Sequence, residues 1–144
     1  LIMLGRGSVL YNELSYEIWG AALEVRKNFG PGHKEKLYQE AFADELSKRK
    51  INFEREKSTR IFHPKTGKAM RCGYQPDFIV DKKIIVELKA APLLPKREID
   101  QLYDYLRNSK YELGYLINFA SSKMKPVRVI YTNDRKTLMT TDKL

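Results

Sequence analysis

The 144-residue chain alternates between two kinds of hydrophobic periodicity, and this alternation predicts the order of its helices and strands. Over residues 15–29, apolar side chains recur three and four positions apart, the spacing of a helix that buries one face. Gly30 and Pro31 supply a stop for this segment. A second helix is predicted over 34–50. Its apolar stripe consists of Tyr38, Ala41, Phe42 and Leu46.

After Ile51 the pattern changes to extended segments. Residues 53–62 and 70–80 are predicted to be strands, separated by a turn that contains Pro and Gly at 63–68. A short polar turn over 81–83 then leads into a third strand over 84–89. We expect these three strands to pair as an antiparallel meander.

A third helix and two apolar strands complete the pattern. The helix is predicted over 96–110, and its expected packing face consists of Ile99, Leu102, Tyr103 and Leu106. The last strands are predicted over 113–119 and 127–132. A helix between the third and fourth strands permits a right-handed parallel crossover. The sequence therefore predicts an α/β fold in which helices flank a central mixed sheet.

The composition is that of one compact domain, because 42% hydrophobic and 31% charged residues exclude a disordered tail and a fibrous protein. We expect the domain to occupy 14–133, with a flexible segment over 1–13 and a peripheral tail over 134–144. The longest apolar runs are only a few residues long, so no membrane contact is expected. The single cysteine, Cys72, cannot form an internal disulfide, which indicates a reducing compartment and a cytoplasmic location.

The charge balance narrows the choice of partners. The chain has 27 Lys and Arg against 18 Asp and Glu, a net charge of +9. This excess favours a polyanionic partner, most simply nucleic acid. A basic surface that serves solubility alone is the alternative.

Three candidate catalytic residues are expected to lie close together in the predicted hairpin. Asp77 follows Pro76 near the start of its strand, and Glu87 and Lys89 lie two apart on the next strand. Side chains two apart on a strand share a face, so Glu87 and Lys89 lie together, and Ile84, Val86 and Leu88 take the opposite face, which suits the core. Pairing around the 81–83 turn is expected to bring Asp77 within about a few ångströms of the Glu87–Lys89 segment.

These residue types suit metal-assisted phosphodiester hydrolysis. Converging carboxylates repel one another unless a cation lies between them, and such hard oxygen ligands suit Mg²⁺ or Mn²⁺. A bound ion acidifies water and polarises a phosphoryl oxygen, while a nearby ammonium orients the attacking water. The alternative is that Glu87 and Lys89 form a solvated ladder pair that contributes roughly a few tenths of a kcal/mol.

Three further polar residues lie beside predicted packing faces. Glu35 extends the buried stripe of the second helix, where a carboxylate requires a partner such as a metal or the Lys89 ammonium. Alternatively, Glu35 is a first-turn acid that complements the helix dipole. Gln101 and Tyr105 lie four apart on the third helix. They either hold a scissile phosphate or a metal-bound water, or cap the edge of the core with polar atoms.

This order of residues resembles the PD-(D/E)xK nuclease superfamily. Pro76-Asp77, nine intervening residues and Glu87-Leu88-Lys89 match its namesake motif. The predicted elements also match its restriction-endonuclease-like α-β-β-β-α-β core. The segment from Gly32 through Glu35 to Tyr38 and the 116–119 strand are similar to the small GxxExxY proteins. The resemblance covers residues 14–131.

The resemblance implies a metal-dependent nuclease with Lys89 as its catalytic lysine. It implies that Mg²⁺ or Mn²⁺ is bound by Asp77 and Glu87, with Glu35 contacting the metal directly or through water. The carbonyl of Leu88 is a further ligand in this reading.

The resemblance also assigns roles on the third helix. Gln101 and Tyr105 are similar to a Gln-x-x-x-Tyr element that supports the active site and contacts nucleic acid. Six basic residues are expected to meet phosphates around the acids: Lys34, Lys36, Lys96, Arg97, Lys123 and Lys125. DNA is expected as substrate rather than RNA, and a homodimer is one way for so small a domain to span a duplex. The alternative is a non-cleaving nucleic-acid-binding or protein-interaction module on the same fold.

Overall fold

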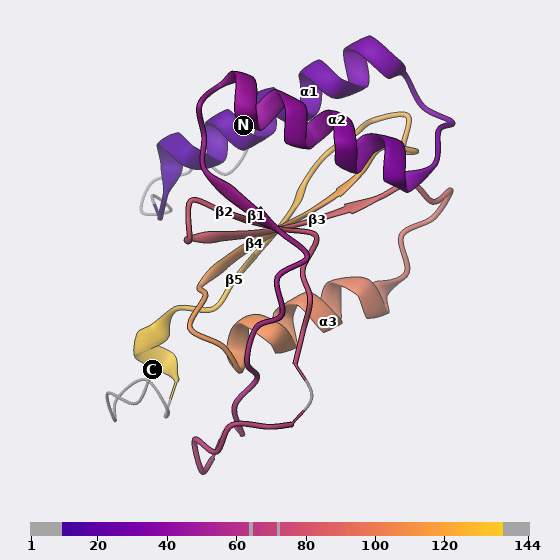
Figure 1. Cartoon of the computed structure of the whole chain (residues 1–144). Coiled ribbons are helices and arrows are strands. Elements are labelled where there is room, and N and C mark those ends of the chain that lie inside the picture. The colour runs from indigo at the N-terminus through magenta and orange to yellow at the C-terminus, as the bar shows by residue number, and fades with distance from the viewer. Residues whose placement is uncertain (1–9, 64, 72, 137–144) are drawn as a thin grey trace.

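A computed structural model describes residues 10–63, 65–71 and 73–136 of the protein (Figure 1). Pro64 and Cys72 lie outside these residues, as do most of the expected flexible segment and most of the expected tail. The described helices and strands follow the predicted order: α1 (Asn12–Phe29), α2 (Glu35–Lys48), β1 (Phe53–Arg55), β2 (Phe78–Val80), β3 (Ile84–Lys89), α3 (Lys96–Arg107), β4 (Leu113–Asn118), β5 (Val127–Ile130) and the 3₁₀ helix η1 (Asn133–Arg135).

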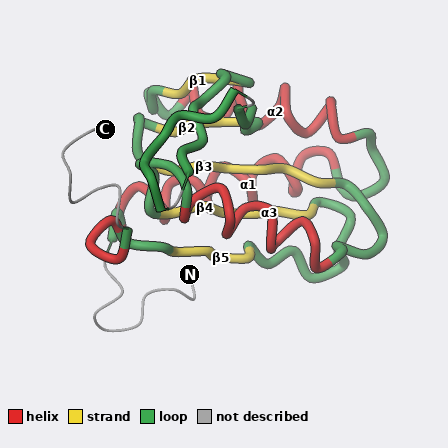
Figure 2. The backbone as a smooth tube through the Cα atoms, turned by 90° about the horizontal axis from the view of Figure 1, so that it is seen from below, coloured by secondary structure: helices red, strands yellow, loops and turns green. Residues whose placement is uncertain are grey.

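The strands form one mixed sheet in the order β1-β2-β3-β4-β5. The first three strands pair antiparallel, β3 and β4 pair parallel, and β5 returns antiparallel. Helix α3 connects the two parallel strands. Figure 2 shows it across one face of the sheet, with α1 and α2 on the other. This is the predicted α/β arrangement, and it is consistent with a restriction-endonuclease-like fold.

Two apolar cores hold the helices to the sheet. The larger core joins α1 and α2 to the face that carries Ile84, Val86 and Leu88, all fully buried. The smaller core joins α3 to the opposite face, where Ile85 packs against Leu102. The predicted alternation along β3 is therefore confirmed, and Glu87 and Lys89 lie on the α3 face.

The predictions of long strands over 53–62 and 70–80 are wrong. β1 ends at Arg55 and β2 begins at Phe78. Between them, residues 57–76 form what we call the arm, which Figure 1 shows extending from the sheet past α3. In the described residues of the arm, the two sides form no continuous ladder but have isolated antiparallel bridges between Thr59 and Tyr74 and between Phe62 and Ala69. Many arm side chains are exposed and polar, so the arm buries too little apolar surface to stabilise a longer ladder.

The predicted packing face of α3 is wrong at one position. Tyr103 is 38% exposed, whereas Tyr105 is 3% exposed and belongs to the smaller core. Tyr103 lies four residues after Ile99, and Tyr105 lies three residues after Leu102. Both are helical spacings, so the periodicity alone does not show which tyrosine is buried. The helix sits on the sheet through the Tyr105 side, and Tyr103 instead meets Tyr131 edge to face at 5.4 Å.

None of the helices in the described part of the chain combines the length and hydrophobicity that crossing a membrane requires.

Candidate active site

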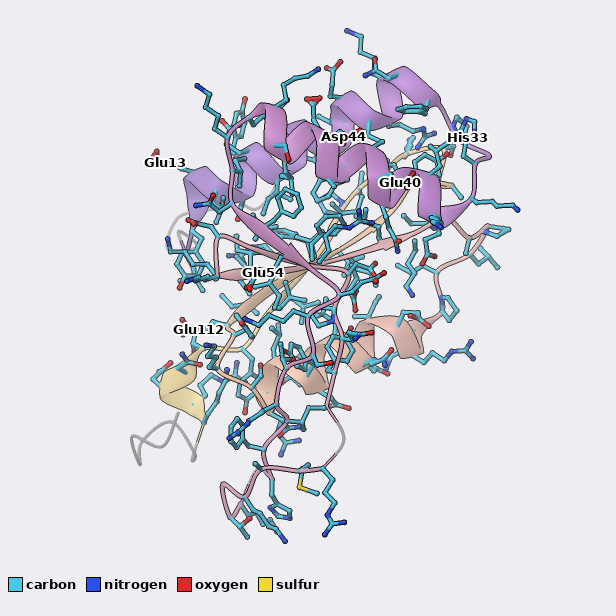
Figure 3. The ribbon with its side chains drawn as sticks, viewed as in Figure 1. Glu13, His33, Glu40, Asp44, Glu54 and Glu112 are labelled. Atoms are coloured by element: carbon cyan, nitrogen blue, oxygen red, sulfur yellow. The ribbon has the colours of Figure 1, made fainter. Side chains whose placement is uncertain are left out.

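Four elements from distant parts of the sequence meet at one edge of the sheet. β3 and β4 are parallel, so their carboxyl ends, Lys89 and Asn118, lie together. The first turns of α2 and α3 lie at the same end of the molecule (Figure 1). Figure 3 shows His33 at this end, whereas the acids Glu13 and Glu112 lie at the opposite end.

Tyr38 fixes the loop that leads into α2. Its hydroxyl donates to the carbonyl of Gly30 at 2.6 Å and accepts the N–H of His33 at 3.2 Å. Its ring stacks on Phe119, just beyond the end of β4, with centroids 4.5 Å apart. Tyr38 therefore ties the start of α2 both to its own entry loop and to the edge of the sheet.

This loop sets the position of Glu35, the first residue of α2. Gly32 has a φ of +100°, a left-handed conformation that side chains rarely adopt, so glycine serves the sharp entry to the helix. The charge of Glu35 raises the pKa of both Asp77 and Glu87, which brings Glu35 into the same electrostatic site as the hairpin acids.

Asp77 and Glu87 hold each other's strands together. The N–H of Asp77 donates to Glu87 Oε1 at 2.8 Å, and the N–H of Leu88 donates to Asp77 Oδ2 at 2.8 Å. Because β2 begins only at Phe78, these side-chain bonds continue the pairing where the backbone ladder has stopped. The two carboxylates are thus held in one place by the hairpin itself.

Burial makes this a costly place for negative charge. Burial raises the pKa of Glu87 to about 7, against the lowering effects of the Asp77 N–H and of Lys89. Burial also raises the pKa of Asp77, while its bond from the Leu88 N–H and the charge of Lys89 act in the opposite direction. The site therefore holds more negative charge than Lys89 alone compensates.

Lys89 is held by a residue that the sequence did not indicate. Its ammonium lies 3.1 Å from Oε1 of Glu98, in the first turn of α3, and not in a pair with Glu35. Burial alone would lower the pKa of Lys89, but the hydrogen bond and charge of Glu98 outweigh it, aided by Glu35 and Glu87, and the pKa is raised. The signal for Glu98 was topological: a crossover helix starts near the carboxyl end of the strand that it follows.

Tyr74, in the arm, is a second residue that sequence reasoning missed. Its hydroxyl donates to Oε2 of Glu87, and its ring stacks on Tyr105 with centroids 4.2 Å apart. The Tyr105 hydroxyl in turn hydrogen-bonds the Thr59 hydroxyl. Burial raises the pKa of Tyr105 to about 12, so this phenol stays protonated near neutral pH. Tyr105 thus reaches the acids through Tyr74, and Gln101 is exposed on α3.

The sequence matches the family model described as the PD-(D/E)XK nuclease superfamily over residues 12–130. The chain belongs to this superfamily. No curated protein and no solved structure matches the chain. Members of the superfamily are typically nucleases, so membership implies a nucleic-acid substrate.

The match includes every predicted site residue, from Lys34 before α2 to Lys125 before β5. Within it, Pro76-Asp77 and Glu87-Leu88-Lys89 are the two halves of the superfamily's namesake motif. The reciprocal hydrogen bonds described above join these two halves.

The six basic residues expected to meet phosphates are all exposed. They come from the start of α2, the start of α3 and the loop between β4 and β5, namely Lys34, Lys36, Lys96, Arg97, Lys123 and Lys125. Two of them have acidic neighbours: Lys96 lies 3.0 Å from Asp100, and Arg97 lies 3.7 Å from Glu98. These segments adjoin the edge at which the superfamily motif lies (Figure 1).

The donor set fits a hydrated divalent cation. In the described residues, no three side chains of Asp, Glu, His or Cys converge closely enough to hold a metal. Mg²⁺ is commonly bound by one or two carboxylates and keeps several waters, so Asp77 and Glu87 suffice. The Lys89 carbonyl accepts the Phe119 N–H at 2.8 Å on the β4 side. Successive carbonyls alternate along a strand, so that of Leu88 points to the side of Asp77, whose carboxylate its N–H already meets.

The raised pKa of Glu87 predicts a pH effect on stability. Its pKa is about 7 in the folded protein against an ordinary 4.5, so between these values the folded state binds more protons than the unfolded state. The free energy of unfolding therefore falls as pH rises from about 4.5 to about 7, by up to about 3 kcal/mol from this group. In EDTA, Glu87→Gln is expected to lose less stability than wild type between pH 5 and pH 7.5.

Urea unfolding at the two pH values measures this difference. Glu40→Gln is the matched control, because Glu40 is exposed on α2 (Figure 3) and is expected to leave the pH dependence unchanged. Equal pH dependence in wild type and Glu87→Gln would show that Glu87 does not titrate in this range.

Proposed function

We propose that this protein is a metal-dependent nuclease that hydrolyses phosphodiester bonds, with DNA rather than RNA as its substrate. One observation carries the proposal: a half-buried carboxylate, Asp77, and a buried one, Glu87, are joined by the hairpin beside Lys89. Both carboxylates have raised pKa values, and the charge of Lys89 lowers both. An incoming cation would therefore stabilise the charged forms of two carboxylates, which burial and, to a smaller extent, the charge of Glu35 disfavour.

The proposed cofactor is Mg²⁺ or Mn²⁺, held by Asp77 and Glu87. The carbonyl of Leu88 would supply a third oxygen, and Glu35 would act through a water. When bound, the ion lowers the pKa of a water and polarises a phosphoryl oxygen. The Tyr74 hydroxyl, which donates to Glu87 Oε2, would keep that carboxylate in one orientation while its remaining lone pairs face the metal.

Lys89 is proposed to orient the attacking water and to offset negative charge on the phosphoryl oxygens. Glu98 acts as its positioning residue, since the ion pair at 3.1 Å holds the ammonium beside the carboxylates. Tyr105 would support the site through its stack on Tyr74. Gln101, exposed on the same helix, would contact the nucleic acid.

We also propose that the chain is a GxxExxY protein within the superfamily. The support is that each letter of this motif has a structural role at the site. Gly32 allows the left-handed turn before α2, Glu35 acts on the hairpin acids, and the Tyr38 hydroxyl closes the entry loop. A cytoplasmic location and a homodimer stay predictions of the sequence.

One assay tests the proposed function. The protein is incubated with single-stranded, duplex and branched DNA and with RNA, in Mg²⁺, Mn²⁺ or EDTA. We expect DNA cleavage with either metal and none in EDTA. Salt-sensitive binding without cleavage would favour a non-cleaving binding module, and no binding at moderate salt would favour a protein-interaction module.

A further inference from the structure

The arm carries a concentration of positive charge that the candidate active site does not use. Residues 57–76 contain five basic side chains and no Asp or Glu: Lys57, Arg60, Lys65, Lys68 and Arg71. The whole chain has a net charge of +9, so this short segment supplies more than half of the excess. Such a run of one sign is the electrostatic pattern of a surface that meets a polyanion.

Part of this charge surrounds a hollow between the arm and the end of α3. The hollow has a volume of about 270 Å³. Its lining includes three cations, Lys57, Arg60 and Lys110, and three hydroxyl side chains, Ser58, Thr59 and Ser109. One acid lies near it, since Glu54 pairs with Lys57 at 2.9 Å. Cationic and hydroxyl donors together are the groups that bind phosphate oxygens.

Hydrogen bonds to the backbone hold the residues that line the hollow in place. The arm is tied to the end of α3, because the N–H of Phe62 donates to the carbonyl of Asn108 at 3.0 Å. The opposite wall is held by Lys136, whose buried ammonium donates to the carbonyls of Ser109 at 2.9 Å and Tyr111 at 2.7 Å. The hollow is therefore a formed feature and needs little ordering to accept a ligand.

A chain of side chains connects the hollow to the acids. Thr59 lines the hollow, and its hydroxyl meets Tyr105, which stacks on Tyr74. Tyr74 in turn donates to Glu87. A strand of nucleic acid held at the acids would thus find the next row of cations on the arm, on the same side of the sheet as α3 (Figure 1).

We propose that the arm and this hollow bind backbone phosphates of the DNA substrate at a distance from the scissile bond. Lys57, Arg60 and Lys110 supply the charge, and the hydroxyl of the exposed Ser58 donates to a phosphate oxygen. The inference rests on the proposed function in taking DNA as the ligand, but it concerns affinity and not chemistry. A small free anion or an acidic peptide would use only the hollow and leave the rest of the arm's charge without a role.

The test compares two triple variants that remove equal charge. The arm variant is Lys57→Gln, Arg60→Gln and Lys110→Gln, and the control variant changes three exposed lysines at the far ends of α2 and the β2–β3 turn: Lys48→Gln, Lys50→Gln and Lys82→Gln. Binding to a fluorescein-labelled duplex of about two helical turns is followed by anisotropy over a range of salt concentrations, in EDTA so that no cleavage occurs.

The arm variant is expected to bind at least tenfold more weakly, with a salt slope smaller by about 2 to 3, the value for three lost phosphate contacts. The control variant is expected to stay within about twofold of wild type. A charge-preserving variant, Lys57→Arg, Arg60→Lys and Lys110→Arg, is expected to bind the duplex with about the affinity of the wild type. Thermal melts of all variants establish that they are folded.

Three results overturn the inference: equal losses in the arm and control variants, wild-type affinity in the arm variant, or no measurable duplex binding by the wild type. Because the assay contains no divalent metal, it is independent of cleavage. A protein that binds through the arm but never cleaves would refute the proposed nuclease and support the arm.

Discussion

Replacing Asp77 with asparagine is expected to reduce metal-dependent cleavage by at least about a thousandfold, about 4 kcal/mol in activation free energy. The amide removes one of the two negative charges that would hold the cation. It keeps an oxygen that accepts the Leu88 N–H, now 2.8 Å from Asp77 Oδ2. Single-turnover cleavage of a labelled duplex in Mg²⁺ and in Mn²⁺ measures the loss.

The same substitution is expected to leave the thermal midpoint unchanged or to raise it. Burial raises the pKa of Asp77, so the folded protein bears the desolvation of a carboxylate that a neutral amide avoids. Asp81→Asn is the matched control: it lies in the β2–β3 turn, pairs with Lys83 at 3.0 Å and is expected to cleave normally. Robust cleavage by well-folded Asp77→Asn protein would refute the proposed metal site.

Replacing Lys89 with methionine is expected to reduce cleavage about 100- to 1,000-fold, the usual effect of losing one group that stabilises transition-state charge. Methionine keeps an unbranched side chain and removes the ammonium. The charge of Lys89 lowers the pKa of both Asp77 and Glu87, so its loss leaves these carboxylates protonated to higher pH. The acid limb of the residual activity profile is therefore expected to move upward in pH.

The Glu98→Gln variant distinguishes the role of the Lys89 ammonium from the role of its ion pair with Glu98. This variant keeps Lys89 but removes the carboxylate 3.1 Å from it, and a loss within about tenfold is expected because the charge remains at the site. Equal losses in Lys89→Met and Glu98→Gln would mean that the ion pair, and not the ammonium itself, is what the reaction needs. Wild-type cleavage by Lys89→Met would exclude Lys89 from the reaction.

The periodicity predicts the architecture wherever side chains of different character alternate between the two faces of a strand. On β3, Ile84, Val86 and Leu88 face one core while Glu87 and Lys89 face α3, as the sequence indicates. The prediction of two long strands was wrong because the residues of the arm suit extended backbone, but in its described part the two sides form isolated bridges and no continuous ladder. The β-propensity of a segment favours an extended backbone, but a β-strand also requires a neighbouring strand with which to form hydrogen bonds.

Only part of the candidate site can be predicted from the sequence. Asp77, Glu87 and Lys89 are predictable because a hairpin brings together residues at a fixed spacing. The contacts of Tyr74 with Glu87 and of Glu98 with Lys89 depend on how the arm and α3 pack against the sheet. Hydrophobic periodicity does not predict this packing, so neither contact was predicted.

The arm leaves the sheet after β1 and returns at β2, and these two strands pair directly with each other. The tip of the arm lies beyond the bridge between Phe62 and Ala69, at the end of the arm away from the sheet and from the hairpin that holds the acids (Figure 1). Doubling the length of such a loop costs only about 0.6 kcal/mol. Changes in the length of the arm's tip are therefore expected to cost little stability and to leave the hairpin of Asp77 and Glu87 intact. Under the proposal that the arm binds DNA, such changes would alter which DNA shapes the protein binds without altering the proposed metal site.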